Sequence, residues 1–202
     1  MTVSSTGTQK TRSLRLGRSP WLLALAVLLL VGVLISLGWL ALNKAEAGTR
    51  QVEGDGIRLS VPESWSEEDT STNEACQNDT LTCEFIFSAP QGYNFSITWY
   101  DQFSETTVAA VDEREWAKFR EYYVTAILLD KEDLEVGGLP AIQRTFMQTD
   151  TNSTPVYLRQ VYVVDGLRLY LITARFFSAD LLDAQDGAVD AVIESIAFTD
   201  ED

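Results

Sequence analysis

An uninterrupted apolar stretch, Trp21–Leu42, constrains this chain more than any other feature. It reads WLLALAVLLLVGVLISLGWLAL and has no charged residue among its twenty-two positions. As an α-helix it would be roughly 33 Å long, at about 1.5 Å of rise per residue. The hydrocarbon core of a bilayer is about 30 Å thick. We therefore expect one transmembrane helix over residues 20–42 and a separate folded domain after it.

The residues before this stretch indicate its orientation. Residues 1–19 are polar, rich in serine and threonine, and contain four cations and no acid, which predicts a disordered basic tail. Cations favour the cytoplasmic side of a membrane helix. We therefore expect a single-pass protein of the cell membrane, with the N-terminus in the cytoplasm and the C-terminal domain outside it. Ala45–Ala47 before Gly48 resembles a signal-peptidase site, so an uncleaved anchor and a cleaved signal both stay open.

The charge balance excludes several classes of function. The 202-residue chain has a net charge of −15, and beyond residue 43 it carries 11 cations against 30 acids. Such a domain repels nucleic acid and anionic lipid surfaces. The chain has no histidine, the commonest general base and transition-metal ligand, and only two cysteines. No nucleotide-binding, hydrolase or EF-hand motif is present. We expect no metal, no cofactor and no enzymatic activity.

Hydrophobic periodicity predicts an α+β domain over residues 56–198. Residues 43–55 are expected to be a linker, residues 66–80 a polar loop, and residues 199–202 an acidic tail. Asp165-Gly166 is a strong hairpin signal. Apolar residues at three- and four-residue steps from Val108 to Ile127 predict one helix, and Ser178 can cap a second. Short turns make consecutive strands antiparallel. Alternation predicts strands over 57–61, 81–89, 94–100, 132–136, 141–148, 156–164 and 167–176.

Three segments resemble the PsbP-like fold. GIRLSVPESW (Gly56–Trp65) resembles its opening strand with Pro-x-x-Trp, GGLPAIQRTF (Gly137–Phe146) its mid-domain strand entry, and GLRLYLITARF with the later IESIAF (Ile193–Phe198) its end. The fold includes the extrinsic PsbP protein of photosystem II, a Ran-binding nuclear import factor and bacterial envelope proteins. The resemblance implies an antiparallel sheet packed between helices, an α/β/α sandwich, and non-enzymatic binding or assembly roles. It carries over no functional residue.

Cys76 and Cys83 are the candidates for a disulfide. Outside the cytoplasm a paired state is expected for two cysteines this close in sequence. The alternative is two separate thiols, with Cys83 buried in its strand.

Four arginines, Arg144, Arg159, Arg168 and Arg175, lie on three adjacent expected strands. Guanidinium groups match carboxylates and other anions, so a shared anion or partner site is one hypothesis. The alternative is pairing of each arginine with acids on neighbouring strands, for example Glu84 or Glu135.

These observations favour a membrane-anchored, extracytoplasmic, non-catalytic interaction or assembly module with a protein partner at the membrane. A small-ligand-binding or sensory envelope domain is the alternative, and a hydrolase the third candidate. Most of the large aromatic side chains, including Trp65, Trp116 and Tyr123, are expected in the core. The acceptor sequences at Asn78, Asn94 and Asn152 matter only in a host that glycosylates them.

Overall fold

The computed structural model describes residues 48–72, 76, 81–150 and 152–199. The expected basic tail (1–19), transmembrane helix (20–42), first residues of the linker (43–47) and acidic end (200–202) lie outside the described residues. In the part of the chain that is described, no helix has the length and apolar character needed to cross a membrane.

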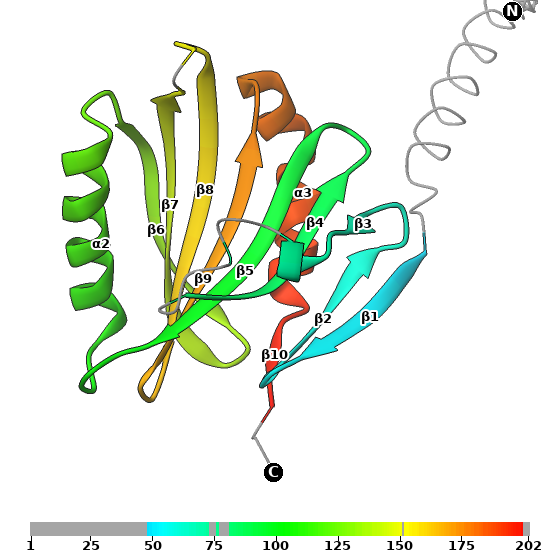
Figure 1. Ribbon diagram of the computed structural model, residues 1–202, viewed down its shortest axis with the longest axis vertical. Coiled ribbons are helices and arrows are strands. Elements are labelled where there is room, and N and C mark those ends of the chain that lie inside the picture. The colour runs from blue at the N-terminus through cyan, green and yellow to red at the C-terminus, as the bar shows by residue number, and fades with distance from the viewer. Residues whose placement is uncertain (1–47, 73–75, 77–80, 151, 200–202) are drawn as a thin grey trace, which may run out of the picture. The chain divides into compact units, whose positions relative to one another are not determined.

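A seven-stranded antiparallel sheet is the centre of the domain (Figure 1). Its spatial order is β3-β4-β5-β9-β8-β7-β6, and every neighbouring pair is antiparallel. The α+β class with an antiparallel sheet is therefore confirmed. The strands are β3 (Ser66–Glu67), β4 (Thr82–Ala89), β5 (Tyr93–Asp101), β6 (Ile127–Val136), β7 (Leu139–Thr149), β8 (Pro155–Asp165) and β9 (Arg168–Phe176).

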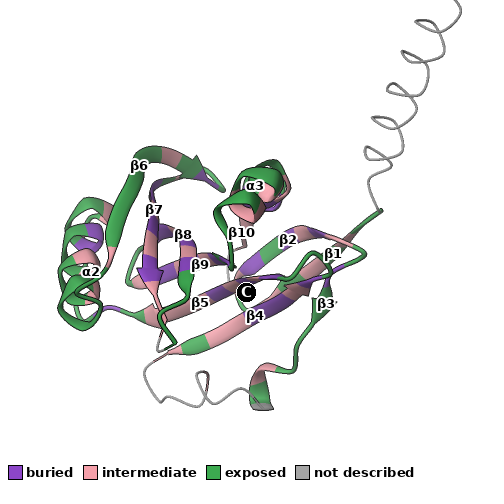
Figure 2. Cartoon of the chain, turned by 90° about the horizontal axis from the view of Figure 1, so that it is seen from above, coloured by how far each residue is buried: buried purple, intermediate pink, exposed green. Residues whose placement is uncertain are grey.

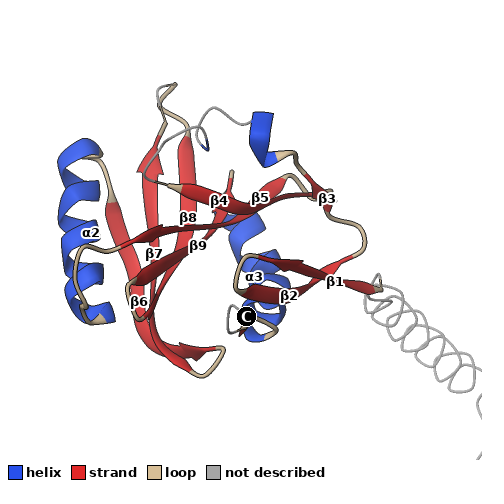
Figure 3. Ribbon diagram, turned by 60° about the horizontal axis from the view of Figure 1, so that its bottom comes forward, coloured by secondary structure: helices blue, strands red, loops and turns tan. Residues whose placement is uncertain are grey.

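Helices cover both faces of this sheet. Helix α2 (Val108–Tyr122) lies on one side, and α3 (Ala179–Glu194) lies on the other with a second, three-stranded sheet (Figures 2 and 3). That smaller sheet has the order β1-β2-β10. A short 3₁₀ helix, η1 (Thr70–Thr72), follows β3, so the segment expected as a polar loop over 66–80 begins with a two-residue strand and one turn of 3₁₀ helix. The three strands of the smaller sheet are β1 (Thr49–Gly54), β2 (Ile57–Pro62) and β10 (Ala197–Phe198).

Local sequence accounts for the helix starts and the core. The side chain of Thr107 accepts a hydrogen bond from the Ala110 N–H, and Ser178 accepts one from Leu181, so both helices have the expected type of N-cap. Strand alternation sends one set of side chains into a large core with α3 and β2, including Trp65, as expected. The other set meets α2 in two smaller clusters.

Three expected boundaries are wrong. Residues Thr49–Gly54 lie within the expected linker, but they form strand β1, which pairs with β2. The helix expected to reach Ile127 ends at Tyr122, because the chain there turns back into the sheet. The strand expected over residues 132–136 therefore begins at Ile127 and has ten residues. Tyr123 and Ile127 continue the three- and four-residue spacing of the helix by chance, although the backbone is no longer helical after Tyr122.

Gly137 and Gly138 form the turn between β6 and β7, with φ angles of 57° and 84°. Both angles lie in the left-handed region that glycine adopts without steric cost. A Cβ on Gly137 would lie 2.7 Å from Cδ2 of Phe198, whereas nothing lies within 4 Å of one on Gly138. Gly137 is therefore needed both for the turn and for the approach of β10.

We expect Gly137→Ala to lower the free energy of unfolding more than Gly138→Ala. Each variant incurs about 1–2 kcal/mol from the left-handed backbone, and Gly137→Ala loses about 1 kcal/mol more through the clash with Phe198. Urea unfolding midpoints at unchanged m-value measure the difference. Equal losses for the two variants would contradict the close approach of Phe198.

Candidate functional site

Arg144 on β7 lies in a buried ion network beneath α2. Its guanidinium donates two hydrogen bonds to the carboxylate of Asp112, one from Nε and one from Nη2 at 2.6 Å. Lys131 on β6 places its Nζ 2.7 Å from the same carboxylate. The side chain of Asp112 is fully buried and that of Arg144 is 3% exposed, whereas Glu113, which also contacts Arg144, is 70% exposed. The network fastens α2 to two strands of the sheet.

The environment keeps Asp112 ionised. Burial alone would raise its pKa, but the hydrogen bonds from Arg144 and Lys131 outweigh burial, and the pKa is held below the usual range for an aspartate. The guanidinium of Arg144 also lies 4.9 Å from the ring centroid of Trp116 on α2. The hydrogen-bonding edge of the Arg144 guanidinium therefore contacts Asp112, and its flat face contacts the ring of Trp116.

Arg159 on β8 binds the other helix. Its Nη1 donates to the Asp186 carboxylate at 2.7 Å, and its Nη2 contacts Asp190. Both aspartates lie on α3, one helical turn apart, and their side chains remain 56% and 42% exposed. The side chain of Arg159 is buried, and its Nε donates to the side-chain oxygen of Gln143. Arg159 thus fastens α3 to the sheet as Arg144 fastens α2.

The other two arginines rest on aromatic rings. The guanidinium carbon of Arg168 lies 3.9 Å from the ring centroid of Trp99, with Asp55 and Asp101 each 3.8 Å away from a guanidinium nitrogen. Arg175 lies 5.2 Å from the ring centroid of Phe177.

The structure does not bring the four arginines together. Arg144 and Arg175 lie on the α2 face of the sheet, and Arg159 and Arg168 lie on the opposite face, because neighbouring positions along a strand point to opposite sides. The partners of the two buried arginines are helix aspartates and not Glu84 or Glu135. Interactions within the domain therefore account for these arginines better than a shared anion site does.

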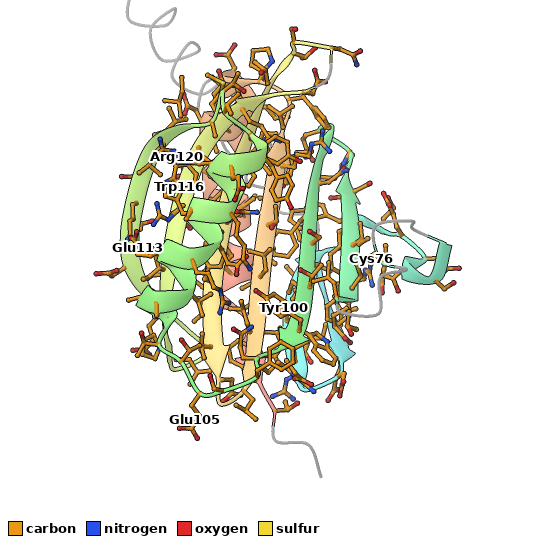
Figure 4. All side chains as sticks on the ribbon, turned by 60° about the vertical axis from the view of Figure 1, so that its left-hand side comes forward. Cys76, Tyr100, Glu105, Glu113, Trp116 and Arg120 are labelled. Atoms are coloured by element: carbon orange, nitrogen blue, oxygen red, sulfur yellow. A yellow bond between two sulfur atoms is a disulfide. The ribbon has the colours of Figure 1, made fainter. Side chains whose placement is uncertain are left out.

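Cys76 and Cys83 form the expected disulfide, with their Cα atoms 5.3 Å apart. The bond joins Cys76, shortly after η1 in the sequence, to Cys83 near the start of β4. Figure 4 labels Cys76. On the loop-entropy account, a bridge of this span contributes about 2.5 kcal/mol to stability. Its role is structural.

A groove lies between α2 and the neighbouring strands, and we call it the α2 groove. Its larger part has a volume of about 920 Å³ between β5, the loop after it and α2. A smaller hollow of about 260 Å³ continues along α2 over β8 and β9. Tyr100, Glu115 and Lys118 line both parts. Figure 4 shows Tyr100 on the β5 side of α2, with Glu113, Trp116 and Arg120 toward β6.

Glu115 organises the polar groups of the α2 groove. It accepts hydrogen bonds from Nε of Arg114 at 2.8 Å, Nζ of Lys118 at 3.2 Å and the hydroxyl of Tyr100 at 3.1 Å. Burial alone would raise the pKa of Glu115, but these donors lower it below the usual range. Burial, followed by the charge of Glu115, raises the pKa of Tyr100. An ionised carboxylate with three donors is suited to positioning its neighbours and not to proton transfer.

Large apolar side chains are exposed where α2 ends and β6 begins, and we call this surface the apolar patch. Tyr122 is 82% exposed and Val124 is 87% exposed. Sequence analysis missed the patch, because Tyr123 and Ile127 were expected on the buried stripe of a longer helix. The six members of the patch are Tyr122, Tyr123, Val124, Ile127, Leu128 and Leu129.

Among residues 48–72, 76, 81–150 and 152–199, no group of three or more acidic, cysteine or histidine side chains is arranged to hold a metal ion. The acidic stretches Glu67–Asp69 and Asp130–Asp133 therefore contribute charge to the surface without forming such a group.

We expect Asp112→Asn to lower the free energy of unfolding at pH 7 by about 3 kcal/mol, because it leaves Arg144 buried without its ionised partner. The folded-state pKa of Asp112 lies below its unfolded value of about 3.9. Its contribution is therefore complete above that pH and is lost as the pH falls through the folded pKa. Unfolding curves from pH 7 to pH 2 should show the gap between variant and parent closing below about pH 4.

Glu113→Gln is the matched control, since Glu113 neighbours Asp112 on α2 but is exposed. It should change stability by less than about 1 kcal/mol. A pH-independent gap for Asp112→Asn, or equal losses in the two variants, would contradict the network.

Comparison with protein-family models and with curated protein sequences finds no match. Solved structures do resemble the domain. Cyanobacterial PsbP from Synechocystis sp. PCC 6803 has a TM-score of 0.56 at 14% identity, over 75% of this chain and 93% of that one.

Two further structures are similar to the same extent. LpqN of Mycobacterium tuberculosis, described as involved in cell envelope biogenesis, has a TM-score of 0.54 at 15% identity, over 76% of this chain and 91% of its own. The Ran-binding protein Mog1p of Saccharomyces cerevisiae has a TM-score of 0.54 at 8% identity, with 76% and 97% covered. The domain therefore has the PsbP-like fold that its sequence resembles.

Proposed function

We propose that the chain is a membrane-anchored, extracytoplasmic, non-catalytic module that binds a protein partner through the apolar patch. The observation that carries the proposal is the exposure of six large apolar side chains within Tyr122–Leu129. Scattered exposed apolar residues are normal, but six within the eight residues Tyr122–Leu129 are a concentration typical of a surface that associates. Burial of the patch by a partner would remove this apolar area from water.

The apolar stretch Trp21–Leu42 and the comparisons support this proposal. An anchor over residues 20–42 would confine the domain to the membrane surface and raise its effective concentration toward membrane partners. Mog1p is described as Ran-binding and LpqN as involved in cell envelope biogenesis, so proteins with this fold include a protein binder and an envelope protein. Their resemblance concerns the fold alone, and the function proposed for this chain rests on its own patch.

One labelling experiment tests both the compartment and the patch. The two cysteines of the chain form a disulfide, so Val124→Cys adds a single reactive thiol in the middle of the patch. Intact cells carrying this variant are treated with a membrane-impermeant maleimide that bears a photoreactive group and are then illuminated. We expect Val124→Cys to be labelled from outside and to form a discrete crosslink to another protein.

The control is Ala184→Cys, an exposed position on α3 at a distance from the patch in sequence and structure. It should be labelled to a similar extent without the discrete crosslink. Labelling of both variants only after lysis would refute the extracytoplasmic location. Equal labelling without a crosslink specific to Val124→Cys would refute the patch as the binding surface.

A second candidate function is the binding of a small ligand in the α2 groove. The volume of about 920 Å³ is within the usual range of ligand pockets, and aromatic rings lie beside polar groups along it. Trp99, Tyr100 and Phe103 supply rings, while Gln102, Arg114 and Lys118 supply hydrogen-bonding groups. The groove is open to solvent along one side, which suits a weakly held or elongated ligand.

Filling the groove tests this candidate. We expect fragments that bind the chain in saturation-transfer NMR to lose their signal in Ser104→Trp, because Ser104 lines the groove and a large ring there would occupy it. Ala184→Trp, on exposed α3, is the matched control and should keep the signal. If the fragment signals survive Ser104→Trp, binding occurs elsewhere and the candidate fails.

A further inference from the structure

Strand β6 leaves one edge of the seven-stranded sheet open. It pairs with β7 on one side, and no described strand pairs with its other side. Pairing with β7 is regular from Asp130 to Val136, after the irregularity between Leu128 and Asp130. Nearly all of β6 is exposed along this length (Figure 2). Backbone N–H and C=O groups on such an edge are free to pair with another extended chain.

Charge is the main protection of this edge, because five of the seven residues from Asp130 to Val136 are charged and four of them are acids. These charges oppose a second acidic edge but not a basic segment. The regular stretch contains no proline, and the irregularity lies before it. Its single lysine, Lys131, is held by Asp112 and Glu113 of α2 and does not project freely from the edge.

Side chains along β6 alternate in chemistry between the two faces. Lys131 points to the α2 face, where it pairs with Asp112, so Asp133 and Glu135 lie on that face too. Leu134 and Val136 point to the opposite face, where both belong to the large core. Glu132 points to that second face as well, where it accepts a hydrogen bond from Gln143. A chain added beside β6 would therefore meet carboxylates on one face, and on the other the carboxylate of Glu132 followed by Leu134 and Val136.

We propose that the open edge of β6 binds an extended segment of a protein partner in which Lys or Arg alternates with apolar residues. The segment adds an eighth strand to the sheet through backbone hydrogen bonds, with its cations beside Asp133 and Glu135 and its apolar residues toward Leu134, which is still partly exposed. Three members of the apolar patch, Ile127, Leu128 and Leu129, lie on the same strand, so the two surfaces adjoin. This inference rests on the proposed interaction function and specifies the partner's chemistry.

Charge distinguishes this occupant from a second copy of the chain. Two β6 edges side by side would bring the acids of Asp130–Glu135 near their own counterparts, and like charges across strands destabilise pairing. A basic segment gains from the same charges. The wider domain, with a net charge of −19 beyond residue 43, also attracts a basic partner.

Peptide binding to the full chain in detergent micelles tests the proposal. The probe is a fluorescein-labelled octapeptide of alternating Lys and Val, followed by fluorescence anisotropy. The first control peptide alternates Glu and Val and tests the charge preference. The second has the Lys-Val sequence with every second backbone amide N-methylated, which removes hydrogen-bond donors needed for strand pairing. We expect the Lys-Val peptide to bind at least tenfold more tightly than either control, and to slow hydrogen exchange of β6 amides.

A matched pair of variants separates the edge from the overall charge. Asp133→Lys with Glu135→Lys should weaken binding at least tenfold. Glu105→Lys with Asp183→Lys makes the same charge change at exposed positions away from β6 and should change the affinity less than twofold. The N-methylated peptide needs no variant, so a misfolded double variant does not remove the test.

Each opposing outcome overturns the inference. Equal binding of the N-methylated peptide would show charge attraction without strand addition, and equal weakening by both variant pairs would show attraction to the whole domain. Absence of binding, or no protection of β6 amides, would also overturn it. If the crosslink from Val124→Cys persists in any of these cases, the interaction function stands and only the strand-addition mode fails.

Discussion

The ion pair between Asp112 and Arg144 fixes helix α2 on the sheet, together with the apolar clusters beneath the helix. A buried charge is costly unless it is paired, and here the aspartate and the arginine satisfy each other while Lys131 adds a second cation. The pair contributes position more than net stability, since a buried ion pair gains little over apolar packing but is costly to break. With α2 held there, the α2 groove forms beside the helix, whereas the open edge of β6 follows from the strand order.

The two faces of the sheet are covered by different elements and to different extents. On one face, α3 and the smaller sheet cover the large core, and Arg159 joins α3 to the sheet through two aspartates. On the other face, α2 covers two smaller clusters and leaves hollows beside it. The surfaces that are available for binding, namely the α2 groove, the apolar patch and the open β6 edge, therefore lie around α2 and β6. This asymmetry supports an interaction module whose working side is the α2 side.

The apolar patch and the β6 edge suit different parts of one binding event. Apolar area is non-directional and contributes affinity, whereas a row of backbone hydrogen-bonding groups fixes register and direction. The acids on β6 add selection by charge. In this picture the α2 groove is either a separate ligand site or the place where a partner's side chains enter beside the strand.

Much of this structure was predictable from local sequence. Alternation located the strands, Asp165-Gly166 marked a hairpin, and Ser178 capped α3, because these signals depend on neighbours within a few residues. The short spacing of Cys76 and Cys83, taken with the expected extracytoplasmic location, likewise predicted the disulfide. What only the tertiary structure decided was which distant groups meet: Arg144 with Asp112 and Arg159 with Asp186.

Those pairings depend on the face to which each strand residue points and on the helix that covers that face. The same holds for β1 and for the end of α2 at Tyr122. A strand needs a neighbouring strand to pair with, and a helix needs a surface to pack on. The residues of the strand or the helix do not by themselves specify that partner.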